Sequence, residues 1–172
     1  MALREVAAVR LIGAIGAGGV LYLTPLVFHQ EAFSASQVTL GLALAALVGT
    51  GGRFLSGVLL DRGVNCGIPV LLAVLASLLG DVRLFSAEGF GAYLVGQVLL
   101  GTAMGLYWPA IELAVPLACA TGPAPMPSGR GYALVRSADA SGIATGALLG
   151  AGLSAAGHLR GIYLVDISCV LV

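Results

Sequence analysis

The sequence contains no lysine, and ionic side chains of any kind are scarce. Arginine and acidic residues, eight of each, make up 9% of 172 residues, whereas 59% of the residues are hydrophobic. A soluble domain of this length needs many more ionic groups to cover its surface. The composition therefore predicts an integral membrane protein, whose outer face is solvated by lipid.

These shortages also exclude several kinds of site. A phosphate-binding P-loop requires a lysine, so we expect no such nucleotide site. The net charge is zero and no basic stripe is present, which argues against a nucleic-acid partner. The three cysteines are far apart and the two histidines stand alone, so we expect neither a disulfide framework nor a metal site. Common catalytic motifs are also missing, and we expect neither an enzyme nor a bound cofactor.

What the chain has in abundance is apolar runs and glycine. The mean hydropathy is +1.03, and 26 residues are glycine, which allows spanning helices to approach closely. A membrane-spanning helix needs about 20 apolar residues. The sequence predicts an all-α domain over residues 1–172, a polytopic bundle of six transmembrane helices at about 6–28, 38–60, 67–85, 90–113, 132–156 and 161–172. The last segment is too short to span, so we expect a truncated helix there.

The distribution of arginine predicts the orientation. If the N-terminus is cytoplasmic, six arginines lie inside and only Arg83 and Arg160 lie outside. We therefore expect a multi-pass protein of the plasma (inner) membrane with a cytoplasmic N-terminus. Asp81 and Arg83 fall in the last turns of the third predicted helix, where long or polar side chains can extend to the membrane interface.

A glycine and two ionic residues mark the inner end of the second predicted helix. Gly57 lies one helical turn before Asp61, and Arg62 follows directly. The glycine permits close contact with a neighbouring helix, and Asp61 can accept hydrogen bonds from the positive end of another helix. Such a cluster holds helices together in one state and releases them in another, as a cytoplasmic gate must.

This spacing resembles the G-x-x-x-D-R/K-x-G-R/K-R/K signature between helices 2 and 3 of the major facilitator superfamily. Gly57, Asp61 and Arg62 match it, whereas Asn65 and Cys66 stand where basic residues are expected. Gly63 comes one position early.

The fourth predicted helix is also similar to its counterpart in that superfamily. Gln97, Gly101 and Gly105 repeat at four-residue spacing, like the pattern R-x-x-x-G-x-x-x-G with Gln97 in place of the arginine. The resemblance covers the whole chain and implies the N-terminal half of a permease, built from two three-helix repeats of opposite orientation.

Membership would imply secondary active transport of a small solute by alternating access. The partners implied are the lipid bilayer, the solute and a second six-helix half, either a missing C-terminal half or another copy. The alternative is a non-transporting membrane protein, either a truncated product or an assembly subunit.

Charged residues inside the predicted helices are further candidates because each is costly within a bilayer. Arg136 and Asp139 are three residues apart and can pair on one helix face. Glu112 can reach Arg130 or Arg136 across the connection between helices 4 and 5. Two interpretations remain open: an ion-pair network that fixes this hairpin, or a role in gating or coupling.

Three polar residues are candidates for the solute or ion pathway. Asp166 either lines the central cavity or pairs near the outer surface, and Tyr22 and Gln97 are polar enough to contact a solute. Tyr107 and Trp108 are expected to anchor the fourth helix at the membrane interface.

Overall fold

A computed structural model describes residues 2–121 and 125–172, which form a bundle of helices. Six helices follow one another along the described chain: α1 Leu3–Gln30, α2 Ala35–Asp61, α3 Gly67–Phe85, α4 Phe90–Thr121, α5 Ser128–Ala155 and α6 Gly161–Val170. The prediction of an all-helical fold is confirmed for these residues. Four helices, α1 to α4, are long and apolar enough to cross a membrane.

The observed helix bounds differ most from the predicted ones around the connection between α4 and α5. α4 continues to Thr121 instead of ending near residue 113, and α5 begins at Ser128 instead of residue 132. α4 contains Pro109 and Pro116 without ending at either, as is common where neighbouring helices compensate for the lost backbone hydrogen bond. α3 has the predicted bounds, and α6 has 10 residues.

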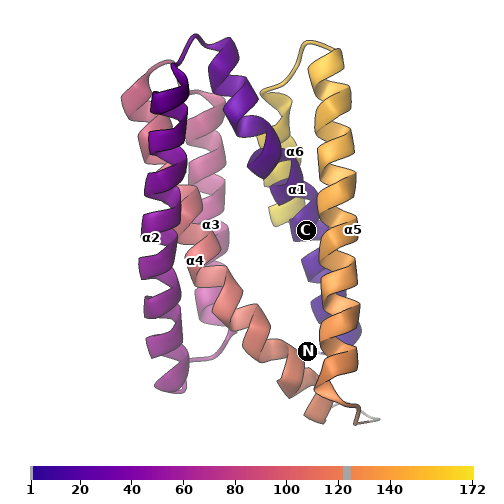
Figure 1. The fold of residues 1–172 in the computed structure, drawn as a ribbon. Helices are drawn as coiled ribbons and strands as arrows, with labels where there is room; N and C mark the ends of the chain where they lie inside the picture. Colours follow the sequence, from indigo (N-terminus) through magenta and orange to yellow (C-terminus); the bar gives the residue numbers. More distant parts are fainter. Residues whose placement is uncertain (1, 122–124) are drawn as a thin grey trace.

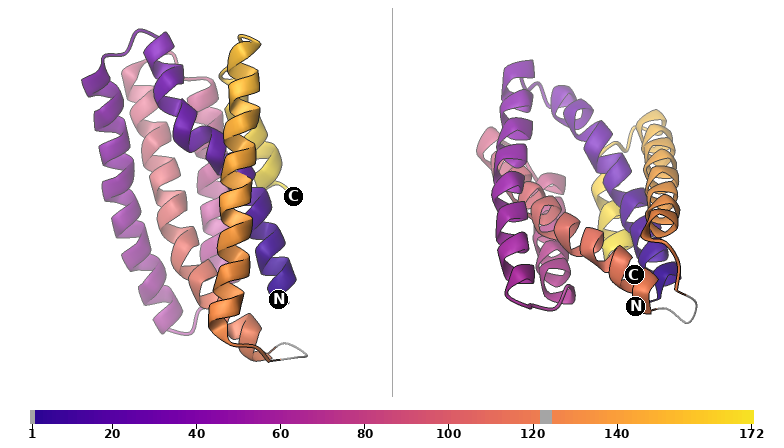
Figure 2. Two further views of the ribbon diagram at one scale, coloured as in Figure 1. Left: turned by 45° about the vertical axis from the view of Figure 1, so that its right-hand side comes forward. Right: turned by 60° about the horizontal axis from the view of Figure 1, so that its bottom comes forward.

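The helices form two groups that α4 connects. In Figure 1, α2, α3 and the first half of α4 lie together on the left, and α1, α5 and α6 lie on the right. The second half of α4 crosses toward the start of α5, and the two views of Figure 2 agree with this arrangement. The most extensive helix packing is between α2 and α4 and between α1 and α5, followed by α3 with α4 and α1 with α6.

Successive helices run in opposite directions, so the connections alternate between two ends of the bundle. The N-terminus, the α2–α3 connection and the start of α5 lie at one end, called the N-terminal end below (Figure 1). The α1–α2, α3–α4 and α5–α6 connections lie at the opposite end. This arrangement brings residues of α1, α4 and α5 together near the N-terminal end.

Glycine brings α2 and α4 into backbone contact. A Cβ atom on Gly101 would overlap the carbonyl group of Ala45, and one on Gly105 would overlap the backbone of Gly49 and Gly52. Any larger side chain at these positions would force the two helices apart, so glycine sets the distance between them.

Glycine has the same role between α1 and α5. A Cβ atom on Gly142 would overlap the carbonyl oxygen of Leu11, and one on Gly146 would overlap that of Ile15. Gly18 of α1 packs in the same way against the backbone of Ile143. The two most extensive helix pairs are therefore both built on glycine contacts.

α2 and α5 also end in the same way. Each is followed by a glycine with a left-handed backbone, Gly63 with φ 79° and Gly157 with φ 76°. The amide of the next residue donates to a carbonyl in the last turn of the helix, over 3.1 Å and 2.8 Å respectively. This is the common glycine-dependent helix ending, and it leads into connections of equal length, 62–66 and 156–160.

Large hydrophobic side chains cover much of the outer surface. Phe54 is 78% exposed, Leu148 73% and Leu47 69%. In contrast, polar side chains such as Ser56 and Asp81 are buried. Apolar residues outside and polar residues inside are what a lipid-solvated bundle requires, and together with the four apolar helices they indicate an integral membrane protein.

Candidate functional site

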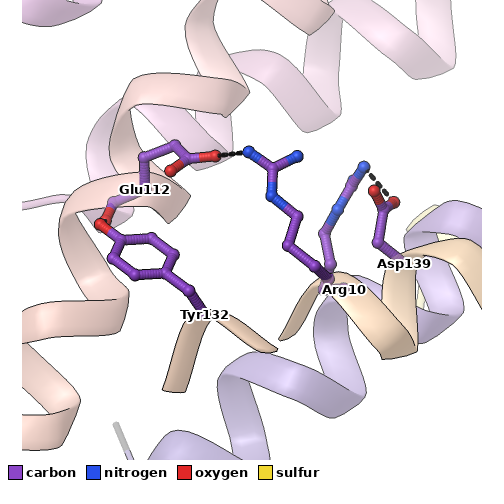
Figure 3. Close-up of polar contacts among 5 residues, drawn as sticks. Arg10, Glu112, Tyr132 and Asp139 are labelled. Atoms are coloured by element: carbon purple, nitrogen blue, oxygen red, sulfur yellow. Dashed lines mark hydrogen bonds and ion pairs between the residues drawn. The ribbon is translucent and has the colours of Figure 1, made fainter. Parts of the chain in front are cut away.

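A cluster of four ionic side chains lies near the N-terminal end, where α1, α4 and α5 meet. The site, called the charge cluster below, consists of Arg10 on α1, Glu112 on α4, and Arg136 and Asp139 on α5. Figure 3 shows how these helices bring the side chains together as two ion pairs. Two cations face two anions, so the cluster carries no net charge.

The inner ion pair joins α1 to α5. The guanidinium group of Arg10 pairs with the carboxylate of Asp139 (Figure 3). Their side chains are only 7% and 12% exposed. One turn beyond Asp139, Gly142 lies against Leu11 and Ala14, and this close approach of the backbones brings the two side chains into reach. A buried charge needs such a partner because burial alone would be costly.

The outer ion pair joins α4 to α5 and is accessible to solvent. Arg136 pairs with Glu112, and their side chains are 56% and 39% exposed. The hydroxyl of Tyr132, one turn before Arg136, donates to the backbone carbonyl of Glu112 over 3.0 Å. The start of α5 is therefore fixed to α4 by both a side chain and a backbone contact.

An indole ring connects the two ion pairs. The guanidinium carbon of Arg10 lies 4.2 Å from the ring centroid of Trp108, and that of Arg136 lies 5.1 Å from it. Both distances are within the range of a cation–π interaction. Tyr107 adds a second ring at 5.3 Å from Arg10. The rings that were expected to anchor α4 at the membrane interface thus contact arginines of α1 and α5, and the interface position stays a prediction.

The structure changes the pairing expected for Asp139. Arg136, three residues earlier on the same helix, is exposed and turns to Glu112, whereas Asp139 is buried and pairs with Arg10. The expected contact between Glu112 and Arg136 is present, and Arg130 is exposed. Arg10 was not predicted as a partner of Asp139, because it was grouped with the arginines expected at the inner membrane surface. Its position within the apolar run of α1 was the available signal.

The residues of the predicted gate lie apart from this cluster. Gly57 does not lie against a neighbouring helix: a Cβ atom added to it would meet no atom of another described helix within 4 Å. The close helix contact expected at Gly57 is therefore absent among the described residues. Asp61 is the last residue of α2 and Arg62 follows it; both are exposed. Neither forms an ion pair with any described residue. The contact predicted for Asp61 with another helix end is therefore not made within residues 2–121 and 125–172.

The three candidates for a solute or ion pathway have different surroundings. Tyr22 is 60% exposed, whereas Gln97 and Asp166 are each 4% exposed. Thr24, near Tyr22 on α1, is buried, and its hydroxyl forms a hydrogen bond of 3.1 Å with that of Tyr163 on α6. Buried polar groups therefore connect α1 and α6, with Tyr22 outside this contact.

Asp81 does not reach the membrane interface as expected. Its side chain is fully buried, with 0% exposure, whereas Arg83 two residues later is exposed. Asp81 faces α6, where the carboxyl group of Asp166 is its neighbour. Asp81 is buried because its face of α3 packs against α6, and the spacing of residues along α3 does not indicate which face that is.

Comparison of the sequence with known proteins finds no matching family model and no match among curated proteins. Within the described residues, no group of three or more histidine, cysteine or acidic side chains is arranged to hold a metal ion. The charge cluster is thus described by its own chemistry: two arginines and two carboxylates around one indole ring, which fix three helices relative to one another near the N-terminal end.

Proposed function

We propose that the chain acts in secondary active transport of a small solute, as one six-helix half of a permease of the major facilitator type. The observation that carries this proposal is a repeat in the helix packing. If α1, α2 and α3 are exchanged with α4, α5 and α6, the α2–α4 contact becomes the α5–α1 contact, and α3–α4 becomes α6–α1. These are the four most extensive helix pairs, and the exchange leaves the set unchanged.

Backbone details support the same repeat. The α2–α4 crossing uses Gly49 and Gly101, and the α1–α5 crossing uses Gly18 and Gly146. α2 and α5 both end in left-handed glycines, and five-residue connections follow both helices. Since each repeat has three helices, the second repeat is inverted relative to the first. Inverted repeats are common in transporters that work by alternating access.

The exposed gate residues fit one half of a two-part transporter. Asp61 and Arg62 are accessible at the N-terminal end and have no ionic partner among the described residues. In this proposal their partner belongs to a second six-helix half, which is either a C-terminal half or another copy. The solute would lie between the two halves, near the midplane of the bilayer.

The charge cluster would stabilise one arrangement of α1, α4 and α5 during the transport cycle. Its outer pair, Glu112 and Arg136, is accessible and therefore weak, whereas its inner pair is buried. The excess of arginine at the N-terminal end favours a cytoplasmic location for this end in the plasma (inner) membrane.

Transport is tested by replacing the gate aspartate. The full chain is reconstituted into vesicles loaded with a mixture of small metabolites, and their loss under an imposed ion gradient is followed by mass spectrometry. We expect Asp61→Ala to slow the loss of one solute class without reducing the amount of inserted protein, because Asp61 is exposed and forms no ion pair with the residues that the structure describes. Arg53→Ala, at an exposed arginine of the same helix, is the matched control and should leave the rate unchanged.

Two results would contradict the proposal. Equal rates of solute loss for the original chain and Asp61→Ala would contradict a role of Asp61 in a gate. If no solute leaves faster than from protein-free vesicles, transport by copies of this chain is contradicted, which favours the alternative that the sequence left open, a non-transporting membrane protein, unless co-reconstitution with a separate C-terminal half restores the loss.

A further inference from the structure

Two carboxyl groups meet inside the bundle, away from the charge cluster. Asp81 lies near the end of α3 and Asp166 in the middle of α6. They are 0% and 4% exposed, and their carboxyl groups are close enough to interact with each other. Two acidic side chains in contact within a bilayer protein require an explanation, because an unpaired charge there is costly.

The proximity of the two buried carboxyl groups favours a proton between them. An ionised carboxylate only accepts hydrogen bonds, so two ionised groups cannot bond to each other. If one of them carries a proton, its hydroxyl donates to the other, and the pair has one negative charge instead of two. Carboxyl pairs that share one proton in this way occur in other proteins, because two adjacent negative charges repel each other strongly.

Other hydrogen-bond donors are scarce around the pair. The Ser77 hydroxyl donates to Oδ2 of Asp81 only over 3.5 Å. The other oxygen of Asp81, Oδ1, is buried and has no donor among the described residues. A proton shared with Asp166 would give this oxygen or its neighbour a partner, since buried polar atoms are nearly always bonded.

No cationic side chain among the described residues forms an ion pair with either carboxyl group. The other titratable groups that act on it are uncharged side chains of α6, Tyr163 and Cys169. α1 presents Gly16, whose missing side chain leaves room for Asp166. α4 contacts α3 here through apolar residues such as Leu100, and α5 contacts α6 through Leu153.

The nearest basic residue along α6 is engaged elsewhere. Arg160 pairs with Glu31 over 3.0 Å and donates two hydrogen bonds of 2.7 Å to the carbonyls of Phe85 and Ala87. None of the three ion pairs among the described residues includes Asp81 or Asp166. A proton is therefore the cation that the described surroundings leave to the pair.

We infer that Asp81 and Asp166 form a proton-binding site between α3 and α6, in which the two carboxyl groups share one exchangeable proton. Separation of α6 from α3 would expose both groups to water and release the proton. In the transporter proposed above, on which this last step rests, the site would couple solute movement to a proton gradient.

Infrared spectroscopy of the full chain in lipid tests the proton site directly. A protonated carboxyl group absorbs apart from a carboxylate, and its band shifts in deuterated water. We expect such a band at neutral pH, corresponding to one group per chain, because the pair shares one proton. Asp81→Asn and Asp166→Asn should each remove it, since the new amide donates to the remaining carboxylate and no shared proton is needed.

Asp61→Asn is the matched control, because it makes the same change at an exposed aspartate and should retain the band. The helical content of each variant, measured by circular dichroism, shows that the variants remain folded. A wild-type spectrum without the band, or a band that survives in both variants, would overturn the inference. So would a carboxylate signal that responds to added sodium or calcium in place of the protonated band, since the site would then hold a metal cation.

The result is independent of the transport assay. A band that behaves as expected in vesicles that move no solute would leave the proton site intact and remove the proposed function. Solute movement by a chain that lacks the band would support the proposed transport function and overturn the proton site.

Discussion

The charge cluster and the carboxyl pair, formed by Asp81 and Asp166, differ in how a buried acidic side chain is neutralised. Both place aspartates inside a bundle whose outer surface is apolar. Asp139 is 8% exposed and faces Arg10, whereas Asp81 is 0% exposed and faces another acid. The first aspartate is neutralised by a fixed opposite charge and the second, in our inference, by a mobile proton.

This difference separates a structural contact from an exchangeable one. An arginine remains charged at any accessible pH, so the contact between Arg10 and Asp139 persists as long as α1 and α5 stay together. A shared proton leaves when water reaches it. The same kind of residue therefore fixes helices at the N-terminal end and can respond to the surroundings between α3 and α6.

The largest effect is expected from removing the anion of the inner ion pair. Asp139→Asn leaves the buried guanidinium of Arg10 without a counter-charge, and the free energy of unfolding should fall by about 3 kcal/mol. It can be measured in mixed detergent micelles from the fluorescence of Trp108, the single tryptophan, which lies 4.2 Å from Arg10.

The matched control removes both charges. The double variant Arg10→Gln/Asp139→Asn should recover much of the lost stability, because no unpaired charge then remains buried. If the single and double variants are equally unstable, the pair is held by packing and not by charge.

A smaller effect is expected at the carboxyl pair. Asp81→Asn replaces one neutral hydrogen-bonding partner by another of similar shape, and the free energy of unfolding should change by about 1 kcal/mol or less. The same micelle assay applies. A loss as large as that of Asp139→Asn would mean that Asp81 is ionised, and the contrast between the two regions would disappear.

The smallest effect is expected at the outer ion pair. Glu112→Gln removes one charge from a pair whose side chains are 39% and 56% exposed, and such pairs contribute about 0–1 kcal/mol. The effect should shrink further at high salt, because ions screen exposed charges. Unfolding measured at two salt concentrations checks this, and a large effect that does not depend on salt would place Glu112 in the buried part of the cluster.

Local features of the fold were readable from the sequence. The bounds of α3 were predicted because an uninterrupted apolar run lies between turn residues, and the contact between Glu112 and Arg136 because a hairpin places the two helix ends together. The end of α4 was predicted too early, since α4 continues through Pro116 to Thr121, which a helix packed among others can do.

The partners of buried charges were not readable in this way. Arg10 and Asp139 are distant in the sequence, and only the close glycine contacts between α1 and α5 bring them together. The spacing along α5 suggested Arg136 as the ion-pair partner of Asp139, because i, i+3 spacing describes contacts within one helix only. The burial of Asp81 could not be predicted for the same reason. Its position near the end of α3 suggested exposure, but the side chain faces α6.

Composition and hydropathy alone determined that this chain is helical and apolar on its outside, because backbone groups in lipid must be satisfied within each segment. They also determined which residues carry charge into the bundle. Only the tertiary structure decided that Asp139 lies beside an arginine and Asp81 beside another aspartate. That choice depends on the rotation and spacing of helices distant in sequence, and glycine at their crossings sets both.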